Sequence, residues 1–361
     1  MSRASLPPFP AGLTPAFLTA VLRAAQVIAD TVAVIGVERQ QVGEGVGMMS
    51  ELSRLVLQYS APVAQAPASL IAKYPSQNAT NRGVAMAFNL YEREVRYFAE
   101  LEPLTTAISP KAYVAEIEDD NFLLLLEDLG EYRTGDQIEG ADLADSAAAV
   151  AELAKLHGAF WNRVEAIDWI PRIHGSSHAD NMLAGTRAGW QNMVDVFGAE
   201  LADEIAAWQP AFSDALPDLQ RQMNAAPVTL IHGDYRMENF LFGTRADHHR
   251  LAIIDWQGPL LGRGMVDVAL VLGQSTRTDV RREHERALVQ QYVDGLQALG
   301  VDYPFATAWE DYLQAMLYNW CYGAVVSGTL DASNARAFAW MSQMVARQVA
   351  ATSDHRLMER L

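Results

Sequence analysis

Three polar residues in the second half of this 361-residue chain have the types and spacing needed for phosphoryl transfer. Asp234 lies in the segment LIHGDYRMENFLF, Asn239 follows it in the same segment, and Asp255 ends the apolar run LAIID. The first carboxylate can orient an attacking hydroxyl, while the amide and second carboxylate can hold the Mg²⁺ ions that neutralise nucleotide phosphates. Each residue alone would be an ordinary turn residue or helix cap, so the prediction rests on their occurrence in this order.

The elements around these residues are predicted to bring two of them to one end of a hairpin. Apolar runs at 240–242 and 251–254 predict short strands, and the polar stretch 243–250, which begins with glycine, predicts the connecting loop. If the strands pair antiparallel, Asn239 precedes one strand and Asp255 follows the other at the same end. This arrangement suits Mg²⁺, which takes oxygen ligands from one or two protein residues together with phosphates and water.

These motifs resemble those of the aminoglycoside phosphotransferase superfamily, near its ecdysteroid-kinase-like branch, whose fold is similar to that of protein kinases. The tripeptide HGD ending at Asp234 corresponds to the HRD motif of protein kinases, and DWQ beginning at Asp255 corresponds to DFG. In the following glycine-rich run, Asp267 would brace the backbone of the catalytic loop. The resemblance implies an α+β, bilobal protein-kinase-like fold, with a small antiparallel β-sheet N-lobe at 1–128 and a mainly helical C-lobe at 129–361.

Such a fold requires a lysine on a strand and a glutamate on a helix that holds it. The stretch 69–75, SLIAKYP, is an apolar strand that carries Lys73, similar to the V-A-I-K strand of kinases. By itself, a lysine at a strand end is commonly a solvated edge residue. The predicted helix 87–98 offers two partners, Glu92 and Glu94. Glu94 better matches the superfamily's pattern, and Glu92 stays open as the alternative.

Glycines precede this strand in the expected place. They lie between predicted strands at 31–37 and 55–59, at positions Gly43, Gly45 and Gly47. Glycine allows backbone N–H groups to approach phosphate oxygens without an intervening side chain. A plain hairpin turn would explain the same glycines equally well.

A hinge segment is predicted after the glutamate helix. The run 121–129, NFLLLLEDL, is an apolar strand with a polar exit. The resemblance implies that the adenine edge pairs with backbone groups from Leu126 to Asp128. An ordinary buried strand is the alternative, and the position between the lysine strand and the catalytic loop favours the hinge.

The remainder of the chain is predicted to be mainly helical. An alanine-rich helix at 141–161 carries His157, which the resemblance implies is structural, and one or two helices follow within 180–223. Further helices are predicted near 266–275, 279–299, 308–327 and 331–351. An aromatic-rich stretch from Trp309 to Tyr322 is expected in the core, with part of its face lining an acceptor pocket.

Composition narrows the class of protein. Half of the residues are hydrophobic and no apolar run reaches membrane-spanning length, so we expect a soluble protein that does not enter a membrane. The single cysteine and the lack of a signal-peptide pattern favour the cytoplasm. A net charge of −17 argues against nucleic acid as a partner. The oligomeric state stays open.

Together these features predict a small-molecule O-phosphotransferase that uses Mg²⁺ and ATP, or another nucleoside triphosphate. Asp234 would be the catalytic residue, Asn239 and Asp255 the metal ligands, and Lys73, held by Glu94, the partner of the α- and β-phosphates. The acceptor would be a small-molecule alcohol. The acidic surface would suit a cationic alcohol, but apolar alcohols are equally open.

The sequence leaves three other functions open. One is a non-catalytic nucleotide-binding module, and another is a protein kinase, although the chain shows no A-P-E-like element after the DWQ motif. A third is a metal-dependent hydrolase that uses His174, His178 and Asp180, whose spacing is loose. The tetrapeptide YRME after HGD also departs from the Leu-Trp that ecdysteroid-type members often carry there, so the resemblance does not identify the acceptor.

Overall fold

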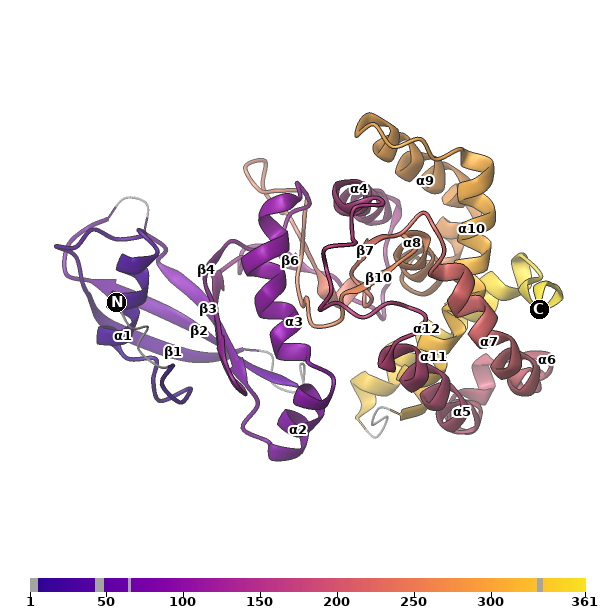
Figure 1. Ribbon diagram of the computed structural model, residues 1–361, viewed down its shortest axis with the longest axis horizontal. Coiled ribbons are helices and arrows are strands. Elements are labelled where there is room, and N and C mark those ends of the chain that lie inside the picture. Colours follow the sequence, from indigo (N-terminus) through magenta and orange to yellow (C-terminus); the bar gives the residue numbers. More distant parts are fainter. Residues whose placement is uncertain (1–5, 43–48, 64–65, 330–333) are drawn as a thin grey trace. The chain divides into compact units, whose positions relative to one another are not determined.

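The computed structural model describes residues 6–42, 49–63, 66–329 and 334–361 (Figure 1). The chain divides into two compact units, each described here by itself. Unit 1 contains residues 1–104, 109–131 and 255–257, and unit 2 contains residues 105–108, 132–254 and 258–361.

Unit 1 is built on a five-stranded antiparallel sheet with the order β1-β2-β3-β5-β4. The strands are β1 (Val34–Val42), β2 (Ser50–Tyr59), β3 (Ser69–Pro75), β4 (Ala112–Glu118) and β5 (Asn121–Glu127). In the register, Lys73 on β3 lies between Leu52 of β2 and Leu124 of β5. The predicted antiparallel N-terminal sheet is therefore confirmed, and its lysine strand is central rather than an edge strand.

The core of unit 1 lies between this sheet and α1 (Pro15–Ala24). Thr14 caps α1 by accepting a hydrogen bond from the amide of Phe17 at 3.2 Å. Leu18 and Leu22 are fully buried on one face of the helix and belong to the same apolar cluster as Leu55 of β2. Burial of each such side chain contributes about 1.5–3 kcal/mol.

The glutamate helix of unit 1 begins later than the predicted 87–98. A separate helix, α2 (Ala79–Ala87), ends first, and Asn89 adopts a left-handed conformation with φ of 53°. Asparagine tolerates that region better than most residues. The chain then forms α3 (Leu90–Arg96), which continues as a π-helix, η1 (Tyr97–Leu101). The prediction merged the end of α2 with α3 because helical spacing alone does not reveal the break at Asn89.

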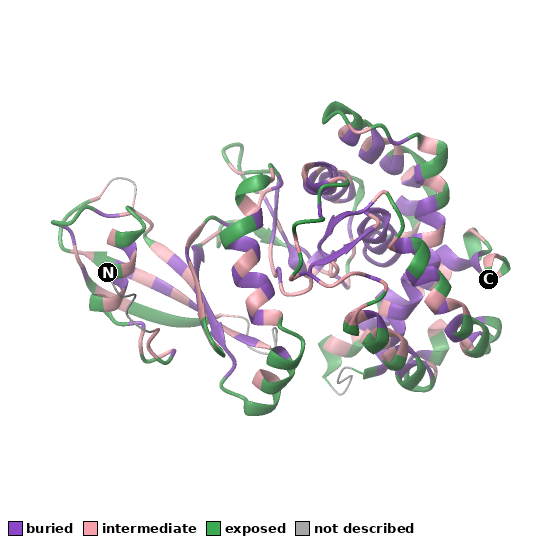
Figure 2. Ribbon diagram, in the orientation of Figure 1, coloured by how far each residue is buried: buried purple, intermediate pink, exposed green. Residues whose placement is uncertain are grey.

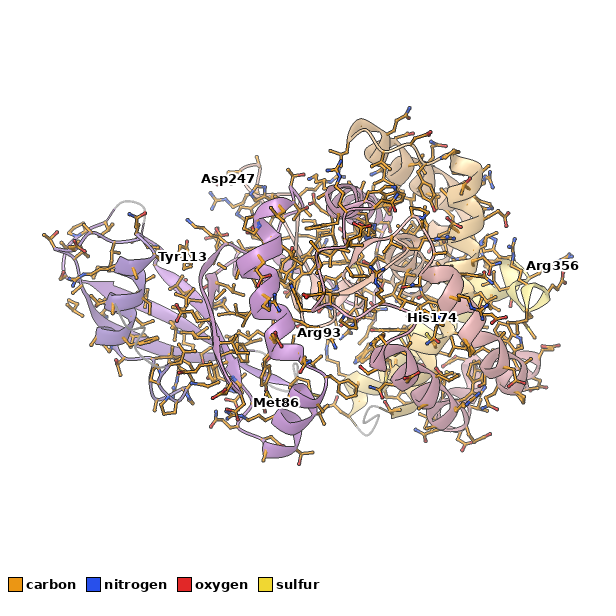
Figure 3. The ribbon with its side chains drawn as sticks, in the orientation of Figure 1. Met86, Arg93, Tyr113, His174, Asp247 and Arg356 are labelled. Carbon is orange, nitrogen blue, oxygen red and sulfur yellow. The ribbon has the colours of Figure 1, made fainter. Side chains whose placement is uncertain are left out.

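Unit 2 contains the predicted hairpin. β8 (Phe240–Phe242) pairs antiparallel with β9 (Leu251–Ile253), which confirms the predicted pairing, and β6 (Arg133–Thr134) adds a third strand. Asp247, labelled in Figure 3, lies in the hairpin loop. A second pair joins β7 (Thr229–Ile231) to β10 (Leu260–Gly262). Every residue of β7 and β10 is buried (Figure 2), so this pair provides a rigid base for the loop that follows β7.

The rest of unit 2 is helical. Its α-helices are α4 (Leu143–Phe160), α5 (Ser177–Phe197), α6 (Asp203–Ala206), α7 (Gln209–Met223), α8 (Met265–Leu270), α9 (Thr278–Ala298), α10 (Phe305–Tyr318), α11 (Trp320–Thr329) and α12 (Ala335–Asp354). None of the helices within the described ranges is both long enough and apolar enough to cross a membrane.

Two helical predictions in unit 2 are wrong. The one or two helices predicted within 180–223 are three, α5, α6 and α7. The predicted helix 308–327 is two helices, α10 and α11, separated at Asn319. Asn319 donates a side-chain hydrogen bond to the carbonyl of Val266 at 3.0 Å, and its own carbonyl accepts one from Gln274 at 3.2 Å. These contacts with a distant segment satisfy polar groups at the break, and local sequence does not encode them.

Helices α5 and α11 approach each other closely through glycine. A Cβ atom built on Gly189 of α5 would lie 2.5 Å from the carbonyl oxygen of Ala324 on α11. A Cβ atom built on Gly328 would lie 2.1 Å from the carbonyl oxygen of Gly189. The lack of side chains at these positions allows the two backbones to touch.

We predict that Gly189→Ala lowers the free energy of unfolding by about 1–3 kcal/mol, because the backbone of α11 must move to accommodate the methyl group. Urea unfolding of the full chain followed by circular dichroism measures the effect. Gly83→Ala is the control, since a Cβ atom on Gly83 in α2 would have no neighbour within 4 Å. Because alanine has a better helix propensity than glycine, Gly83→Ala should stabilise α2 by up to about 1 kcal/mol. Equal losses in both variants would contradict the close helix packing.

Candidate active site

The first group of predicted site residues meets within unit 1, around the ammonium of Lys73. Its Nζ donates to Glu94 Oε1 at 2.7 Å and to Asp255 Oδ1 at 3.0 Å. Lys73 and Glu94 are 6% and 1% exposed. Glu92 instead forms an ion pair with Arg96 at 3.3 Å. Of the two glutamates that the sequence left open, the structure places Glu94 against Lys73.

Burial and charge oppose each other in this cluster. Burial lowers the pKa of the Lys73 ammonium, but the Asp255 and Glu94 carboxylates outweigh it, so the net shift is upward and the ammonium stays charged. Burial raises the pKa of Glu94, against the effect of the Lys73 charge. Glu94 Oε2 is buried and has no hydrogen-bond partner. The cluster is therefore held by charge pairing rather than by a complete hydrogen-bond network.

Asp255 is held at the start of the DWQ motif in a left-handed conformation with φ of 64°. The next two residues anchor it within unit 1. The Trp256 ring stacks on Tyr97 with centroids 3.6 Å apart, and its indole N–H donates to Ser109 at 3.1 Å. Gln257 donates to Ser50 at 3.0 Å. The Asp255 side chain remains 37% exposed, with Oδ1 bonded to Lys73.

The second group of predicted site residues meets within unit 2, in the loop after β7. The Asn239 side-chain amide donates to the Asp234 carbonyl at 2.8 Å and to Asp234 Oδ2 at 2.9 Å. This orientation leaves the amide oxygen of Asn239 as the atom that can ligate a cation. The carbonyl of Asn239 accepts from the amide of Ile254 at 3.0 Å, and Ile254 directly precedes Asp255 in the chain. The side-chain oxygen of Asn239 in unit 2 is of the kind that Mg²⁺ prefers, as are the carboxylate oxygens of Asp255 in unit 1.

A buried carboxylate braces this loop. Asp267 of α8 is fully buried and accepts hydrogen bonds from the backbone amides of His232 at 2.6 Å and Gly233 at 3.1 Å. The His157 ring lies 3.4 Å from the same carboxylate. Gly233 has φ of 78°, and a Cβ atom there would lie 2.2 Å from the carbonyl oxygen of Gly258. The HGD tripeptide therefore needs its glycine, and His157 lies in the supporting structure behind the loop.

Two residues that the sequence did not assign to the site contact Asp234. Arg236 Nε donates to Asp234 Oδ1 at 3.0 Å, and the Tyr322 hydroxyl donates to the same oxygen. Arg236 could have been suspected from its place two residues after the aspartate. Tyr322 lies 88 residues away on α11, in the aromatic-rich stretch that was expected to line part of an acceptor pocket, but the sequence did not single it out.

The remaining predicted nucleotide-binding residues are placed as follows. Gly43, Gly45 and Gly47 lie outside the described residues. Leu126 is on β5, where it pairs with Ile71 of β3. Asp128 follows β5, and its carboxylate accepts from Arg54 Nε and the Ser69 hydroxyl, each at 2.7 Å. The Asp128 side chain is thus engaged in stabilising the end of the strand, which leaves backbone groups for any adenine contact.

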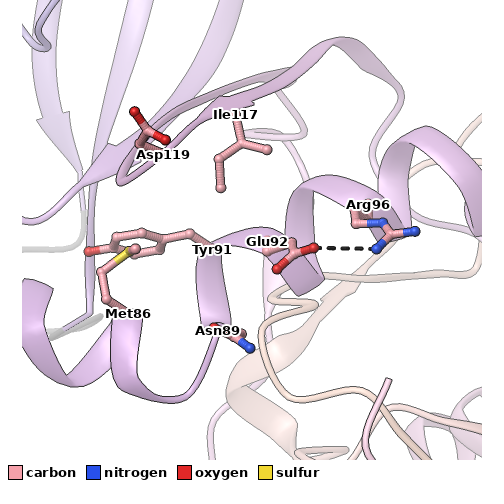
Figure 4. A pocket seen from close by; sticks show the side chains of 7 residues that line it. All are labelled: Met86, Asn89, Tyr91, Glu92, Arg96, Ile117 and Asp119. Carbon is pink, nitrogen blue, oxygen red and sulfur yellow. Dashed lines mark hydrogen bonds and ion pairs between the residues drawn. The ribbon is translucent and has the colours of Figure 1, made fainter. Parts of the chain in front are cut away.

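Unit 1 also contains a cavity that includes none of these residues. It measures about 250 Å³ and is lined by Met86, Asn89, Tyr91, Glu92, Arg96, Ile117 and Asp119 (Figure 4). Three of its lining residues, Tyr91, Glu92 and Arg96, lie on α3, which also carries Glu94. The cavity therefore adjoins the helix that positions Glu94, and the chemistry predicted from the sequence lies elsewhere.

The alternative metal site is not formed. Among the described residues, no group of three or more histidine, cysteine, aspartate or glutamate side chains is placed to hold a metal ion, and this includes His174, His178 and Asp180. His174, labelled in Figure 3, lies in the segment before α5. The structure therefore offers no support for the hydrolase that the sequence left open.

This chain is similar to known proteins over most of its length. A model of the ecdysteroid kinase-like family matches residues 44–301. The choline kinase of Cryptosporidium parvum Iowa II is 11% identical with a TM-score of 0.56, covering 94% of this chain and 96% of its own. A microcompartment-associated aminopropanol kinase is 16% identical with a TM-score of 0.56, covering 93% and 99%. The GDP complex of aminoglycoside 2′-phosphotransferase-IIIa is 13% identical with a TM-score of 0.54, covering 94% and 99%.

These likenesses to solved structures confirm the predicted α+β, kinase-like fold. No curated protein matches the chain.

We predict that Asp267→Asn lowers the free energy of unfolding by about 1–3 kcal/mol, because an amide can satisfy only one of the two backbone N–H groups that the carboxylate accepts. Urea unfolding checks this value. Asp279→Asn is the control, since Asp279 pairs with Arg277 on the exposed surface, and it should leave stability unchanged. An Asp267 variant as stable as the control would show that the carboxylate does not brace the loop.

Proposed function

The chain belongs to the ecdysteroid kinase-like family, and we propose that it is a small-molecule phosphotransferase that moves the γ-phosphoryl group of ATP to a hydroxyl group. The observation that carries the proposal is the buried Lys73 ammonium, which contacts Glu94 and Asp255 at 2.7 and 3.0 Å. Replacing a buried ion pair such as Lys73–Glu94 with well-packed apolar residues is often neutral or stabilising. A function that requires the charges explains why they are there.

The nucleotide side of the proposed site uses Lys73, Asn239 and Asp255. Lys73 pairs with the α- and β-phosphates, and Glu94 keeps its ammonium in position. Asn239 and Asp255 would hold Mg²⁺, which neutralises charge on the phosphates. We further propose that residues 1–128 form the nucleotide lobe and residues 129–361 the lobe that supplies the acceptor site.

The acceptor side of the proposed site centres on Asp234. Its carboxylate orients the acceptor hydroxyl and takes its proton as the new O–P bond forms and the bond from the γ-phosphorus to the bridging oxygen breaks. ADP leaves with the electron pair of that bond. Because the transition state needs little covalent help, alignment and charge neutralisation supply most of the acceleration.

The solved structures that share the fold support a small-molecule acceptor. They include a choline kinase, an aminopropanol kinase and an aminoglycoside phosphotransferase. Each name describes phosphoryl transfer to a small molecule that carries a hydroxyl group. We propose the same reaction class here, with ATP as the donor.

We predict that Asp234→Asn binds MgATP normally but lowers kcat by about 10²–10⁴-fold, because it removes the group that takes the acceptor proton. Asp255→Ala should instead lose Mg²⁺-dependent ATP binding. Calorimetric titration with ATP, in Mg²⁺ and in EDTA, measures binding, and an ATP-consumption screen of alcohols and amino sugars provides the acceptor for kcat. Unchanged turnover in Asp234→Asn would refute the assignment. MgATP binding without turnover on any acceptor would instead indicate a non-catalytic nucleotide-binding module.

We also predict that Glu94→Gln weakens MgATP binding roughly tenfold or more, because loss of one partner of a buried pair leaves the Lys73 charge poorly positioned. Glu92→Gln is the matched control on the same helix. Its partner is Arg96 on the helix surface, so its affinity should match the wild type. The same titration compares them, and an equal loss in both variants would indicate damage to α3 rather than a specific Lys73–Glu94 contact.

A further inference from the structure

Arg236 contacts Asp234 and the side chains near it, which are the groups that a positively charged ligand would bind. Its Nε donates to Asp234 Oδ1 at 3.0 Å, and its Nη1 donates to the Glu238 carboxylate. Its guanidinium carbon lies 4.8 Å from the ring centroid of Trp340. The side chain is only 19% exposed, so the guanidinium is held in one place rather than extended into solvent.

A protein recognises an ammonium group with carboxylates and with the faces of aromatic rings. Asp234 and Trp340 provide one of each in unit 2, and Arg236 contacts both. Burial alone would lower the pKa of its guanidinium, but Asp234, Tyr322 and Glu238 outweigh that effect and raise it, so Arg236 stays charged. A permanent internal cation thus fills this position.

The second carboxylate beside Arg236 has a further cationic partner. Glu238 lies 3.5 Å from Arg336 as well as contacting Arg236. Arg336 also lies 3.7 Å from Asp136, so two guanidinium groups face three carboxylates, Asp234, Glu238 and Asp136, among the residues that the structure describes. The two carboxylates next to Arg236 therefore each have a guanidinium partner already.

The helix that reaches Asp234 adds no charge of its own. Helix α11, with the sequence WCYGAVVSGT, carries no charged residue and contributes the Tyr322 hydroxyl to Asp234. Val325 and Val326, one turn further along, are half-buried. Helix α11 therefore brings no charged side chain to the surroundings of Asp234.

We infer that Arg236 is a specificity-determining residue that takes the place of an acceptor's cationic group at Asp234 and Trp340. This inference rests on the proposed function, because it treats Asp234 as the residue that meets the acceptor. The protein then selects an alcohol with no ammonium group near its hydroxyl. Removing the guanidinium exposes a cation site that the wild-type chain keeps filled.

The test uses two alcohols of nearly the same shape that differ in charge: choline, and 3,3-dimethylbutan-1-ol, in which carbon replaces the quaternary nitrogen. Calorimetric titration of the full chain measures the affinity for each. Wild type should bind the neutral alcohol at least as tightly as choline. Arg236→Met should bind choline roughly tenfold more tightly than wild type does, with little change for the neutral alcohol, since two carboxylates and a ring face become available.

Three variants show whether the charge of Arg236 is responsible. Arg236→Lys keeps a cation in place and should retain the wild-type preference. Arg336→Met removes a cation whose ion pairs are with Glu238 and Asp136 rather than with Asp234, so it is the matched control and should not gain choline affinity. Arg236→Met combined with Asp234→Asn should lose the gain, which would locate the new cation at Asp234. Circular dichroism verifies folding, and Arg236→Gln replaces Arg236→Met if the latter does not fold.

Several results would overturn the inference. The inference fails if the wild type binds choline tenfold more tightly than the neutral alcohol. It also fails if Arg236→Met, or Arg236→Gln in its place, gains no affinity for choline, or if Arg336→Met gains as much. The titrations need no turnover, so a failure of the proposed phosphoryl transfer appears in the ATP-consumption assay and not here. Conversely, if the protein phosphorylates alcohols but Arg236→Met gains no affinity for choline, the proposed function stands and only the inferred role of Arg236 is wrong.

Discussion

The cost of burying the Lys73 ammonium is the constraint on which much of unit 1 depends. A charge removed from water must be paired, or the group becomes neutral. The chain pairs it with Glu94 of α3 and with Asp255, which follows β9 in sequence. The stacked Trp256 and the hydrogen bond of Gln257 then keep Asp255 in unit 1. A central strand, a helix and a distant loop are thereby joined at one buried cation.

Unit 2 also contains a buried charged group that must be satisfied, but its charge is negative. The buried Asp267 carboxylate is satisfied by backbone amides of the HGD tripeptide, so the loop adopts a defined shape before any ligand arrives. Asp234 then emerges from that loop with three donors around it, from Asn239, Arg236 and Tyr322. Preorganised charges of this kind are effective because they need not reorganise when a reaction proceeds. The proposed chemistry and the inferred acceptor preference both arise from this one carboxylate.

Local patterns predicted much of the fold. The β8–β9 hairpin, the lysine strand β3 and the long helix α4 were all expected, because their periodicity and turn residues lie within short windows of sequence. The breaks at Asn89 and Asn319 were not expected. The first break occurs where Asn89 adopts a left-handed conformation. At the second, Asn319 donates a hydrogen bond to Val266 and accepts one from Gln274. Neither leaves a signal in helical spacing.

The sequence by itself determined which residue types occur in which order, and thus the reaction class that Asp234, Asn239, Asp255 and Lys73 suggest. It also led to the prediction that a glutamate within 87–98 would meet Lys73. Only the tertiary structure decided that this is Glu94 and not Glu92, because side chains two positions apart point to different faces of a helix. The tertiary structure likewise brought Tyr322 to Asp234 across 88 residues. Contacts between distant segments depend on how elements pack, which no local pattern contains.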